Sequence, residues 1–286
     1  MKPPPFEYVD PRTVAETLER LATHGDDAKI LAGGQSLLPM LNLRLARPAV
    51  IVDVNRVAGL DGLTTENGRL RVGALVRQRA LERWAASHAP LLAAALRLVG
   101  HIAIRNRGTV AGSIAHADPA SELPALLLCL DGVVVAESRR GRREIAAHAL
   151  FEGPLVTALA ADELITETRF ELPHAGEGWG FHEVARRHGD FALVGVAAVI
   201  AREGGRVGRA RVSVFGAGPT PLRAEAAERA LLGREPTPTQ VAEAAAAGAA
   251  ALAPVADLHA SADYRRRVAR TLLGRALTDA AARSRP

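Results

Sequence analysis

Two stretches of the sequence combine small residues with hydrogen-bonding groups in a pattern that suits anion binding. In the first, residues 32–36 read Ala-Gly-Gly-Gln-Ser and follow a short apolar run. Paired glycines adopt backbone angles closed to other residues, so successive N–H groups can point into one concavity, called a nest. A nest binds an anion, most often phosphate, and Gln35 and Ser36 could add side-chain hydrogen bonds. An ordinary tight turn between a strand and a helix is the alternative, because a lone Gly-Gly pair is a weak signal.

The second stretch runs from residue 104 to residue 122. Its small residues, at positions 108, 109 and 111–113, permit close approach of the backbone to a ligand. The hydroxyls of Thr109 and Ser113 can donate or accept hydrogen bonds, whereas the carboxylates of Asp118 and Glu122 suit sugar hydroxyls. The sequence therefore predicts two separate binding segments for one extended polar ligand.

His116 and Asp118 do not predict a catalytic pair. They lie two residues apart in a predicted loop, and no serine nucleophile motif accompanies them. As metal ligands they lack partners at useful spacing. We therefore expect neither a catalytic residue nor a metal site.

The composition of the chain excludes several classes of protein function. With 286 residues and 48% apolar residues, the chain is long enough for two domains with real cores. The net charge of +5 comes from arginines scattered along the chain, without the interleaved aromatics of single-strand readers, so we expect no nucleic-acid partner. The single cysteine, Cys129, rules out a disulfide framework and any iron–sulfur cluster held by this chain alone.

The N-terminal sequence Met-Lys-Pro-Pro-Pro lacks the apolar core of a signal peptide. No apolar run approaches the length needed to span a membrane. We expect a cytoplasmic protein.

The first binding segment lies in a predicted β–α–β unit. The pattern predicts a helix ending at His24, a strand over 29–32, a helix over 37–45 and a strand over 49–54. The next elements predicted are, in order, a strand over 70–74, helices over 75–86, 91–99 and 123–130, a strand pair joined by the arginine-rich turn at 138–143, and a strand over 163–172.

A Gly-rich loop at 174–180 indicates a domain boundary, which divides the chain into domains 1–175 and 176–286, the first with subdomains of about 1–56 and 57–175. The second domain is predicted to hold three strands over 181–185, 193–202 and 209–215, then helices over 224–232, 239–251 and 262–283. An antiparallel sheet backed by helices is the natural α+β arrangement for this half. Gly-Ala-Gly-Pro at 216–219 only superficially matches a dinucleotide fingerprint, since the full glycine spacing is missing.

Together, the motifs at 32–40, 105–113 and 116–119 resemble the FAD-binding medium subunit of molybdenum hydroxylases, of the carbon monoxide dehydrogenase medium-subunit type. The resemblance extends to 189–192 and 221–224, and so covers nearly the whole chain. It implies an α+β fold: a two-part FAD-binding domain of the vanillyl-alcohol oxidase / xanthine dehydrogenase type, followed by a small antiparallel sheet backed by helices.

The resemblance also implies roles for individual residues. In the family, two motifs enclose the FAD pyrophosphate, an acidic residue lies at the adenosine part, and an aliphatic residue packs on the isoalloxazine ring. The first motif is matched by Leu31, Ala32, Gly33, Gly34, Gln35, Ser36 and Leu37, and the second by Thr109, Ala111, Gly112 and Ser113. The acidic position is matched by Glu122, with Asp118 as a neighbouring alternative, and the aliphatic position by Ile165, or by Leu164 if the register slips.

Two positions depart from the family pattern. Ala111 stands where the family usually has a glycine, so its methyl must point away from the ligand or the loop must shift. Glu183 replaces a lysine that related proteins often carry near the flavin. A carboxylate there should lower the flavin potential and disfavour the approach of a nicotinamide.

The resemblance implies a subunit role in electron relay. A molybdopterin-binding large subunit hydroxylates the substrate, a small subunit with two [2Fe–2S] clusters carries electrons, and FAD passes them to NAD, a quinone or another acceptor. The expected assembly is a heterotrimer that dimerises. Two alternatives are a self-contained flavoprotein oxidase and a docking module that has lost FAD.

Overall fold

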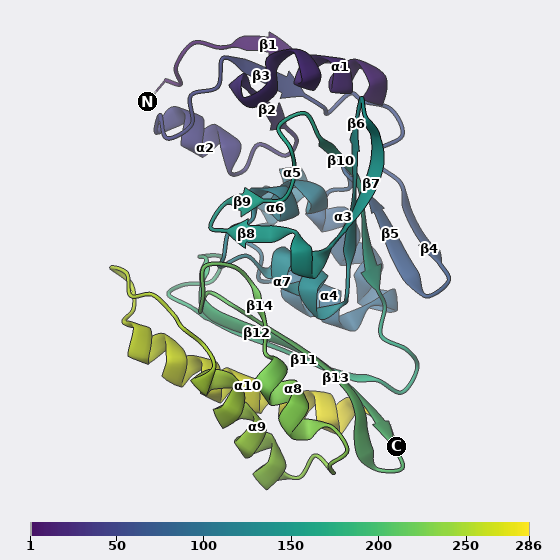
Figure 1. Cartoon of the computed structure of the whole chain (residues 1–286), viewed down its shortest axis with the longest axis vertical. Helices are drawn as coiled ribbons and strands as arrows, with labels where there is room; N and C mark the ends of the chain where they lie inside the picture. Colours follow the sequence, from purple (N-terminus) through teal and green to yellow (C-terminus); the bar gives the residue numbers. More distant parts are fainter. Residues whose placement is uncertain (1, 286) are drawn as a thin grey trace.

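The computed structural model describes residues 2–285. Three sheets follow one another along its longest axis, and the chain passes through them in sequence order (Figure 1). The described part is a mixture of helix and sheet, as the predicted α+β class requires. No helix within residues 2–285 is both long enough and apolar enough to cross a membrane.

The N-terminal unit is a parallel three-stranded sheet in the order β1-β3-β2. Its elements are β1 (Glu7–Val9), α1 (Val14–His24), β2 (Ala28–Leu31), α2 (Leu37–Asn42) and β3 (Val50–Asp53). The hydroxyl of Thr13 caps α1 by accepting the N–H of Glu16. The β–α–β unit is confirmed, but α2 ends three residues before the predicted end. Arg44 takes the left-handed conformation, at φ 59°, which an α-helix cannot continue.

The middle unit is a five-stranded sheet in the order β4-β5-β10-β6-β7 with helices packed beside it. Its strands are β4 (Leu63–Glu66), β5 (Arg69–Gly73), β6 (Val133–Ser138), β7 (Gly141–Ala146), β10 (Leu164–Glu171) and a separate small pair, β8 (Phe151–Gly153) and β9 (Val156–Thr157). Its helices are α3 (Gln78–His88), α4 (Pro90–Leu96), α5 (Ile102–Arg107), α6 (Val110–His116) and α7 (Glu122–Cys129). Every residue of α7 is buried, so this helix lies inside the molecule.

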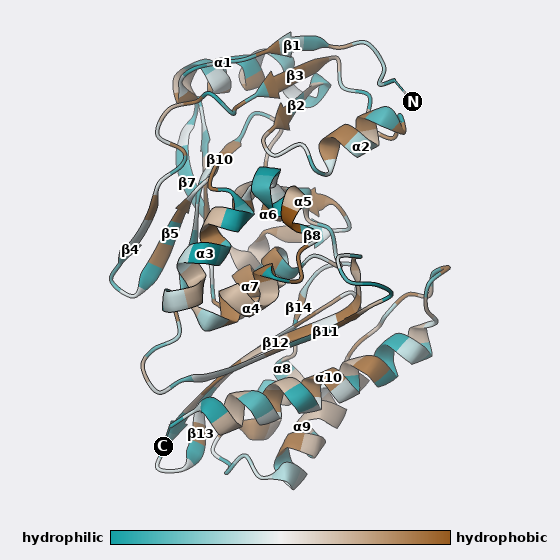
Figure 2. Cartoon of the chain, turned by 180° about the vertical axis from the view of Figure 1, so that it is seen from behind, coloured by the Kyte–Doolittle hydropathy of each residue, from teal (hydrophilic) through white to brown (hydrophobic). Residues whose placement is uncertain are grey.

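The C-terminal unit is an antiparallel sheet in the order β11-β12-β13-β14, covered on one face by three helices (Figures 1 and 2). Its elements are β11 (Gly178–Ala185), β12 (Ala192–Glu203), β13 (Arg206–Phe215), β14 (Leu222–Arg223), α8 (Glu225–Leu231), α9 (Pro238–Ala250) and α10 (Ala262–Arg283). The predicted sheet backed by helices is therefore present.

The two faces of this sheet belong to different cores. Val194, Val196 and Ala198 of β12 pack with the helices, whereas Ala197 and Val199, on the other face, pack with the middle unit. This is the two-residue alternation of a strand covered on both sides. The C-terminal sheet is thus the shared wall between its own helices and the rest of the molecule.

An ion-pair network joins the middle unit to the C-terminal unit at one end of α7. Arg211 of β13 is only 2% exposed, and its guanidinium lies 3.0 Å from Glu171 and 3.4 Å from Glu177. Arg209 bonds to the same two carboxylates, at 3.0 and 2.6 Å. Because Glu177 is itself almost fully buried, each charge depends on its partners for the solvation that water no longer provides.

Removing the Arg211 guanidinium should therefore destabilise the fold strongly. Arg211→Met leaves buried carboxylates short of a counter-charge, and we expect a loss of about 3 kcal/mol in the free energy of unfolding. Urea denaturation measures the loss. Arg206→Met, at an exposed position of the same strand, is the control and should change stability by less than about 0.5 kcal/mol. Equal effects of the two substitutions would contradict the role given to the network.

Candidate functional site

The two glycine-containing segments identified in the sequence meet in the structure. A Cβ on Gly33 would lie 2.6 Å from the carbonyl oxygen of Arg107 and 2.7 Å from the Cα of Gly108. No side chain fits in that space, so the backbones of the loop after β2 and the loop before α6 touch directly. The site is built on this contact between segments that are far apart in sequence.

The first segment presents free backbone donors. Within the described residues, the N–H groups of residues 33–37 donate to no protein acceptor, while the carbonyl of Gly34 accepts from Leu38 at 3.1 Å. Gly34 has φ +74°, a conformation that glycine adopts without strain. Ser36, the residue before α2, makes no side-chain capping bond. A run of unpaired N–H groups is what an anion-binding nest requires.

The side chain of Gln35 is partly used within the loop. Its Nε2 donates to the carbonyl of Gly33 at 3.1 Å, which fixes the turn. The side chain remains exposed, and its amide oxygen remains free as an acceptor. Gln35 therefore shapes the loop in addition to any contact with a ligand.

The second segment starts α6. Thr109 is 2% exposed and caps this helix, its Oγ1 accepting the N–H of Gly112 at 3.1 Å. A Cβ on Gly112 would meet Ala32 of the first segment at 3.8 Å, which places Gly112 beside the first motif. Ala111 is 4% exposed and belongs to the hydrophobic core. Its methyl therefore points into the core, and the departure from glycine leaves the loop surface unchanged.

Two residues that the sequence analysis did not identify hold the segments together. Asn55 follows β3, and its Nδ2 donates to the carbonyl of Ala32 at 2.8 Å. Its Oδ1 accepts from Arg77 at 2.7 Å, and Arg77 also donates to the carbonyl of Arg107 at 2.6 Å. The chain of bonds runs from one segment to the other. Burial, with the nearby charge of Arg107, lowers the pKa of Arg77, while Asp53 opposes this shift.

The sequence around Asn55 and Arg77 gives only a weak indication that these residues link the two segments. Asn55 comes two residues after the end of a buried strand, and Arg77 directly precedes α3, so both lie where elements end and side chains can reach a loop. Their hydrogen-bond partners are 22 to 30 residues away, which single-segment patterns do not reveal.

The acidic positions behave differently from each other. Asp118 is half-buried, and its Oδ1 accepts the N–H of Ala120 at 2.8 Å, as in a turn-forming aspartate. Glu122 starts α7 and is 5% exposed. Burial raises the pKa of Glu122 to about 8, and the charges of Glu183 and Asp118 add to the shift.

Ile165 and Leu164 both lie at the start of β10, where they are 5% and 2% exposed. Both belong to the core of the middle unit.

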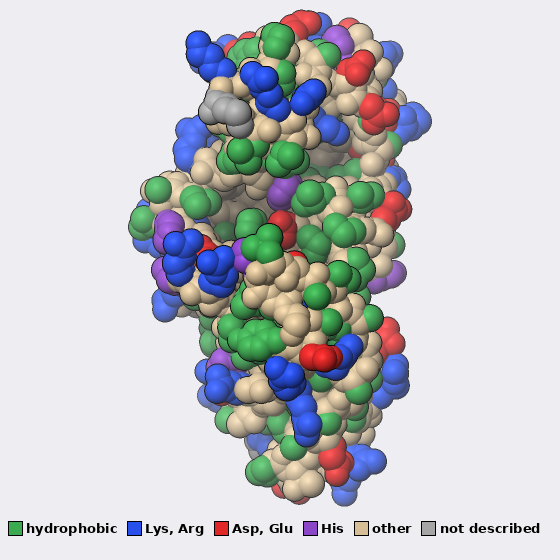
Figure 3. All heavy atoms as spheres, turned by 90° about the vertical axis from the view of Figure 1, so that its left-hand side faces the viewer, with side chains coloured by type: hydrophobic (Ala, Val, Ile, Leu, Met, Phe, Trp, Pro, Cys, Tyr) green, Lys and Arg blue, Asp and Glu red, His purple; other side chains and the backbone are tan. Residues whose placement is uncertain are grey.

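Figure 3 shows that one face of the molecule is hollowed between its upper and middle parts, with hydrophobic side chains on the rims.

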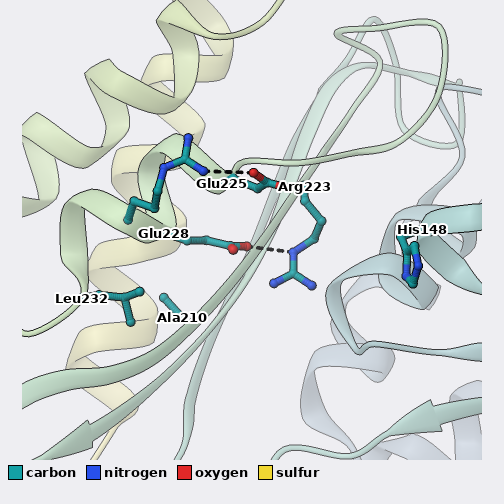
Figure 4. Close-up of a pocket in the computed structure, with 7 residues that line it drawn as sticks. His148, Ala210, Arg223, Glu225, Glu228 and Leu232 are labelled. Carbon is teal, nitrogen blue, oxygen red and sulfur yellow. Dashed lines mark hydrogen bonds and ion pairs between the residues drawn. The ribbon is translucent and has the colours of Figure 1, made fainter.

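A second hollow lies elsewhere, between C-terminal elements and His148 of the middle unit (Figure 4). It measures about 410 Å³ and is lined by His148, Ala210, Arg223, Glu225, Glu228, Arg229 and Leu232. Its arginines are already paired, Arg223 with Glu228 at 2.8 Å and Arg229 with Glu225 at 3.0 Å. None of the segments with free N–H groups borders it, so it is separate from the site at Gly33.

Two family models together match most of the chain. Residues 4–175 match the FAD binding domain in molybdopterin dehydrogenase. Residues 179–280 match the CO dehydrogenase flavoprotein C-terminal domain.

Full-length relatives agree with these matches. The chain is 43% identical to the 6-hydroxypseudooxynicotine dehydrogenase complex subunit alpha of Paenarthrobacter nicotinovorans, over 100% of this chain and 98% of the relative. It is 42% identical to the nicotine 6-hydroxylase medium subunit of the same organism, over 99% and 100%. A solved carbon monoxide dehydrogenase from Hydrogenophaga pseudoflava superimposes with a TM-score of 0.97 at 40% identity, covering 100% of both chains.

The nest can be tested with a pair of glycines that share one backbone conformation. Gly34 and Gly68 both have φ +74°, but only Gly34 has neighbours within 4 Å, the side chains of Leu31 and Leu38. Gly34→Val should abolish FAD binding, measured by flavin absorbance of the purified chain, while the C-terminal unit stays folded. Gly68→Val carries the same backbone strain and should keep its flavin. A Gly34→Val protein with full flavin content would exclude the nest.

The link through Arg77 predicts a graded effect. Arg77→Lys keeps the charge but loses the planar guanidinium, whose two nitrogens donate to Asn55 and to the carbonyl of Arg107. We expect FAD affinity to fall by about 1.5 kcal/mol, which is a tenfold rise in Kd. Equilibrium dialysis of the FAD-depleted chain measures it. Arg83→Lys, at an exposed position on α3, is the control, and an equal loss in both variants would count against the link.

Proposed function

Because this chain belongs to the FAD-binding medium subunits of the molybdenum hydroxylases, we propose that its two touching glycine segments hold the FAD pyrophosphate. The observation that carries the proposal is the run of unpaired N–H groups at residues 33–37. These groups form a cradle that a side chain at Gly33 would fill. The residues present therefore fit the cofactor.

Within this proposal each segment has its own task. The N–H groups of the first motif, Ala32 to Ser36 with Leu37, bind the diphosphate, and the second motif, Thr109 to Ser113, lies on its other side. Glu122, or Asp118 beside it, lies at the adenosine part, and Ile165, or Leu164, packs on the isoalloxazine ring. Arg77 and Asn55 keep the two motifs in register. We also propose the division into domains 1–175 and 176–286.

The chain is an oxidoreductase subunit whose task is to hold FAD within a complex that also has a molybdopterin-binding large subunit and an iron–sulfur small subunit. When bound, FAD supplies the chemistry of accepting single electrons and passing them on as a pair. The residues of this chain bind and orient the cofactor, and no acid or base of the chain is required for that task. Cys129, buried in the core, is the chain's one cysteine, so the clusters of the relay belong to a partner.

We propose that the acceptor of this complex is a quinone or another carrier in preference to NAD. The supporting observation is Glu183, an acid where related proteins often carry a lysine: its neutral form offers an anionic dinucleotide no positive charge, and its ionised form repels the dinucleotide. We also propose a cytoplasmic location and, as the family resemblance implies, a heterotrimer that dimerises.

The two alternatives receive no such support. A self-contained oxidase would need a substrate domain, whereas full-length relatives of this chain are themselves medium subunits. A module that had lost FAD would have no reason to keep a cradle of unpaired N–H groups.

The visible spectrum tests the function directly. The purified chain, with FAD added and the excess removed, should show the two absorption bands of oxidised flavin, and denaturation should release the cofactor as FAD. The same measurement on the chain co-expressed with its partner subunits covers the case in which the site closes only in the complex. A complex that stays free of flavin would refute the proposal.

A further inference from the structure

Two acids lie between the FAD-binding region and the C-terminal sheet with no basic partner of their own. Glu122 is 5% exposed at the start of α7, and its own backbone N–H donates to its carboxylate. Glu183 lies in β11, and its Oε2 is buried without a hydrogen-bond partner. Unpaired buried carboxyl oxygens are uncommon, because burial without a partner costs free energy.

The register of β11 fixes which way Glu183 faces. A Cβ on Gly178 or Gly180 would overlap the backbone of α10, so the even-numbered residues of β11 face this helix. His182 follows the pattern and bonds to Asp279 of α10 at 3.0 Å. Odd-numbered residues face the other way, as Phe181 does in packing with the core of the middle unit. Glu183 therefore points toward the FAD-binding region and not toward α10.

The charged groups around the pair do not neutralise it. Arg105, whose charge lowers the pKa of Glu122 only in part, bonds instead to Glu82 at 2.9 Å and to the carbonyls of Val99 and Gly100. Asp118 adds further negative charge on the same side. His116 lies close to Asp118, and burial lowers its pKa, which favours the neutral imidazole.

Burial raises the pKa of Glu183 to about 7. Burial also raises the pKa of Glu122 to about 8, with a further contribution from the charge of Glu183. The charge of Glu183 thus opposes the ionisation of Glu122, so the titrations of the two acids are linked. Near neutral pH the pair retains a proton that neither acid would keep in water.

We propose that Glu122 and Glu183 form a proton-retaining acid pair that makes cofactor binding depend on pH: the site holds the anionic FAD tightly while the pair keeps a proton, and loosely once both acids are charged. This inference rests on the proposed function, because it assumes that FAD occupies the site beside α7. In proteins with a lysine at position 183 the charge at this place is fixed, whereas in this chain it changes with pH.

The direction of the pH dependence follows from the direction of the pKa shifts of Glu122 and Glu183. Both acids have a higher pKa in the folded chain than in the unfolded chain, so protonation favours folding. Their contribution to stability is complete below pH of about 4.5 and is lost as the pH rises toward 8. The negative charge of bound FAD raises the pKa of the pair further, so affinity falls over the upper part of this range.

The Kd of the full chain for FAD, measured by equilibrium dialysis from pH 6 to pH 9, tests the proposal. For wild type we expect Kd to rise about tenfold across this range, which corresponds to one unit of pKa shift on binding. Glu183→Gln removes one titrating group and the repulsion it exerts on Glu122, so the rise should shrink to about threefold or less. Glu235→Gln removes an exposed carboxylate in the loop after α8 and should behave as wild type.

A second measurement needs no cofactor. Unfolding of the FAD-free chain by urea at pH 5 and pH 9 should show Glu183→Gln gaining stability relative to wild type at the higher pH, by about tenfold in the unfolding equilibrium constant. A pH-independent Kd in wild type, or an unchanged dependence in Glu183→Gln, would overturn the pH control of binding. An equal response of both proteins to pH in the FAD-free test would overturn the acid pair. A chain without FAD affinity at any pH would instead overturn the proposed function.

Discussion

The whole site depends on one contact between two stretches of backbone. Gly33 and Gly108 approach so closely that a single added carbon at position 33 would overlap the carbonyl of Arg107. In the loop after β2, the N–H groups of residues 33–37 donate to no acceptor among the described residues. Unsatisfied donors are unfavourable in an isolated protein and favourable when an anion arrives. The unsatisfied N–H groups that make the free loop unfavourable are thus the same groups that allow it to bind an anion.

The surrounding structure is arranged to maintain this contact. Asn55 and Arg77 join the two loops through side chains, and α6, which begins with the second motif, packs against the fully buried helix α7. The C-terminal sheet in turn bonds to α7: the hydroxyl of Ser213 donates to the carbonyl of Ala125 at 2.9 Å. Because β12 contributes to the core of the middle unit, the second half of the chain supports the site mechanically. Its strand β11 also directs the side chain of Glu183 away from α10, toward the middle unit.

The sequence predicted best where a periodic pattern runs over many residues. The helix α10 has the bounds predicted for it, 262–283, because Ser261 caps its start and its apolar positions recur over six turns. The strands missed were β1, β4, β8, β9 and β14, each of two to four residues, too short to show alternation. In the site, the glycines were recognisable because their conformation restricts residue type. Asn55 and Arg77 were not, because a hydrogen bond to a distant carbonyl leaves no local pattern. The family resemblance identified the ligand as FAD. The chemistry of the residues alone predicted only a phosphate-containing ligand.

The two departures from the family pattern differ in physical kind. Ala111 adds a methyl whose direction is set by the helix it belongs to, and that direction is into the core, so the ligand side of the loop is unaffected. Glu183 places an acid where charge is poorly solvated, because burial raises its pKa to about 7. A permanently ionised carboxylate there would be strongly unfavourable, yet a proton is always available from water to remove the charge. Burial therefore favours the neutral form of Glu183 over part of the pH range, and this explains how the fold can accept an acid at this position.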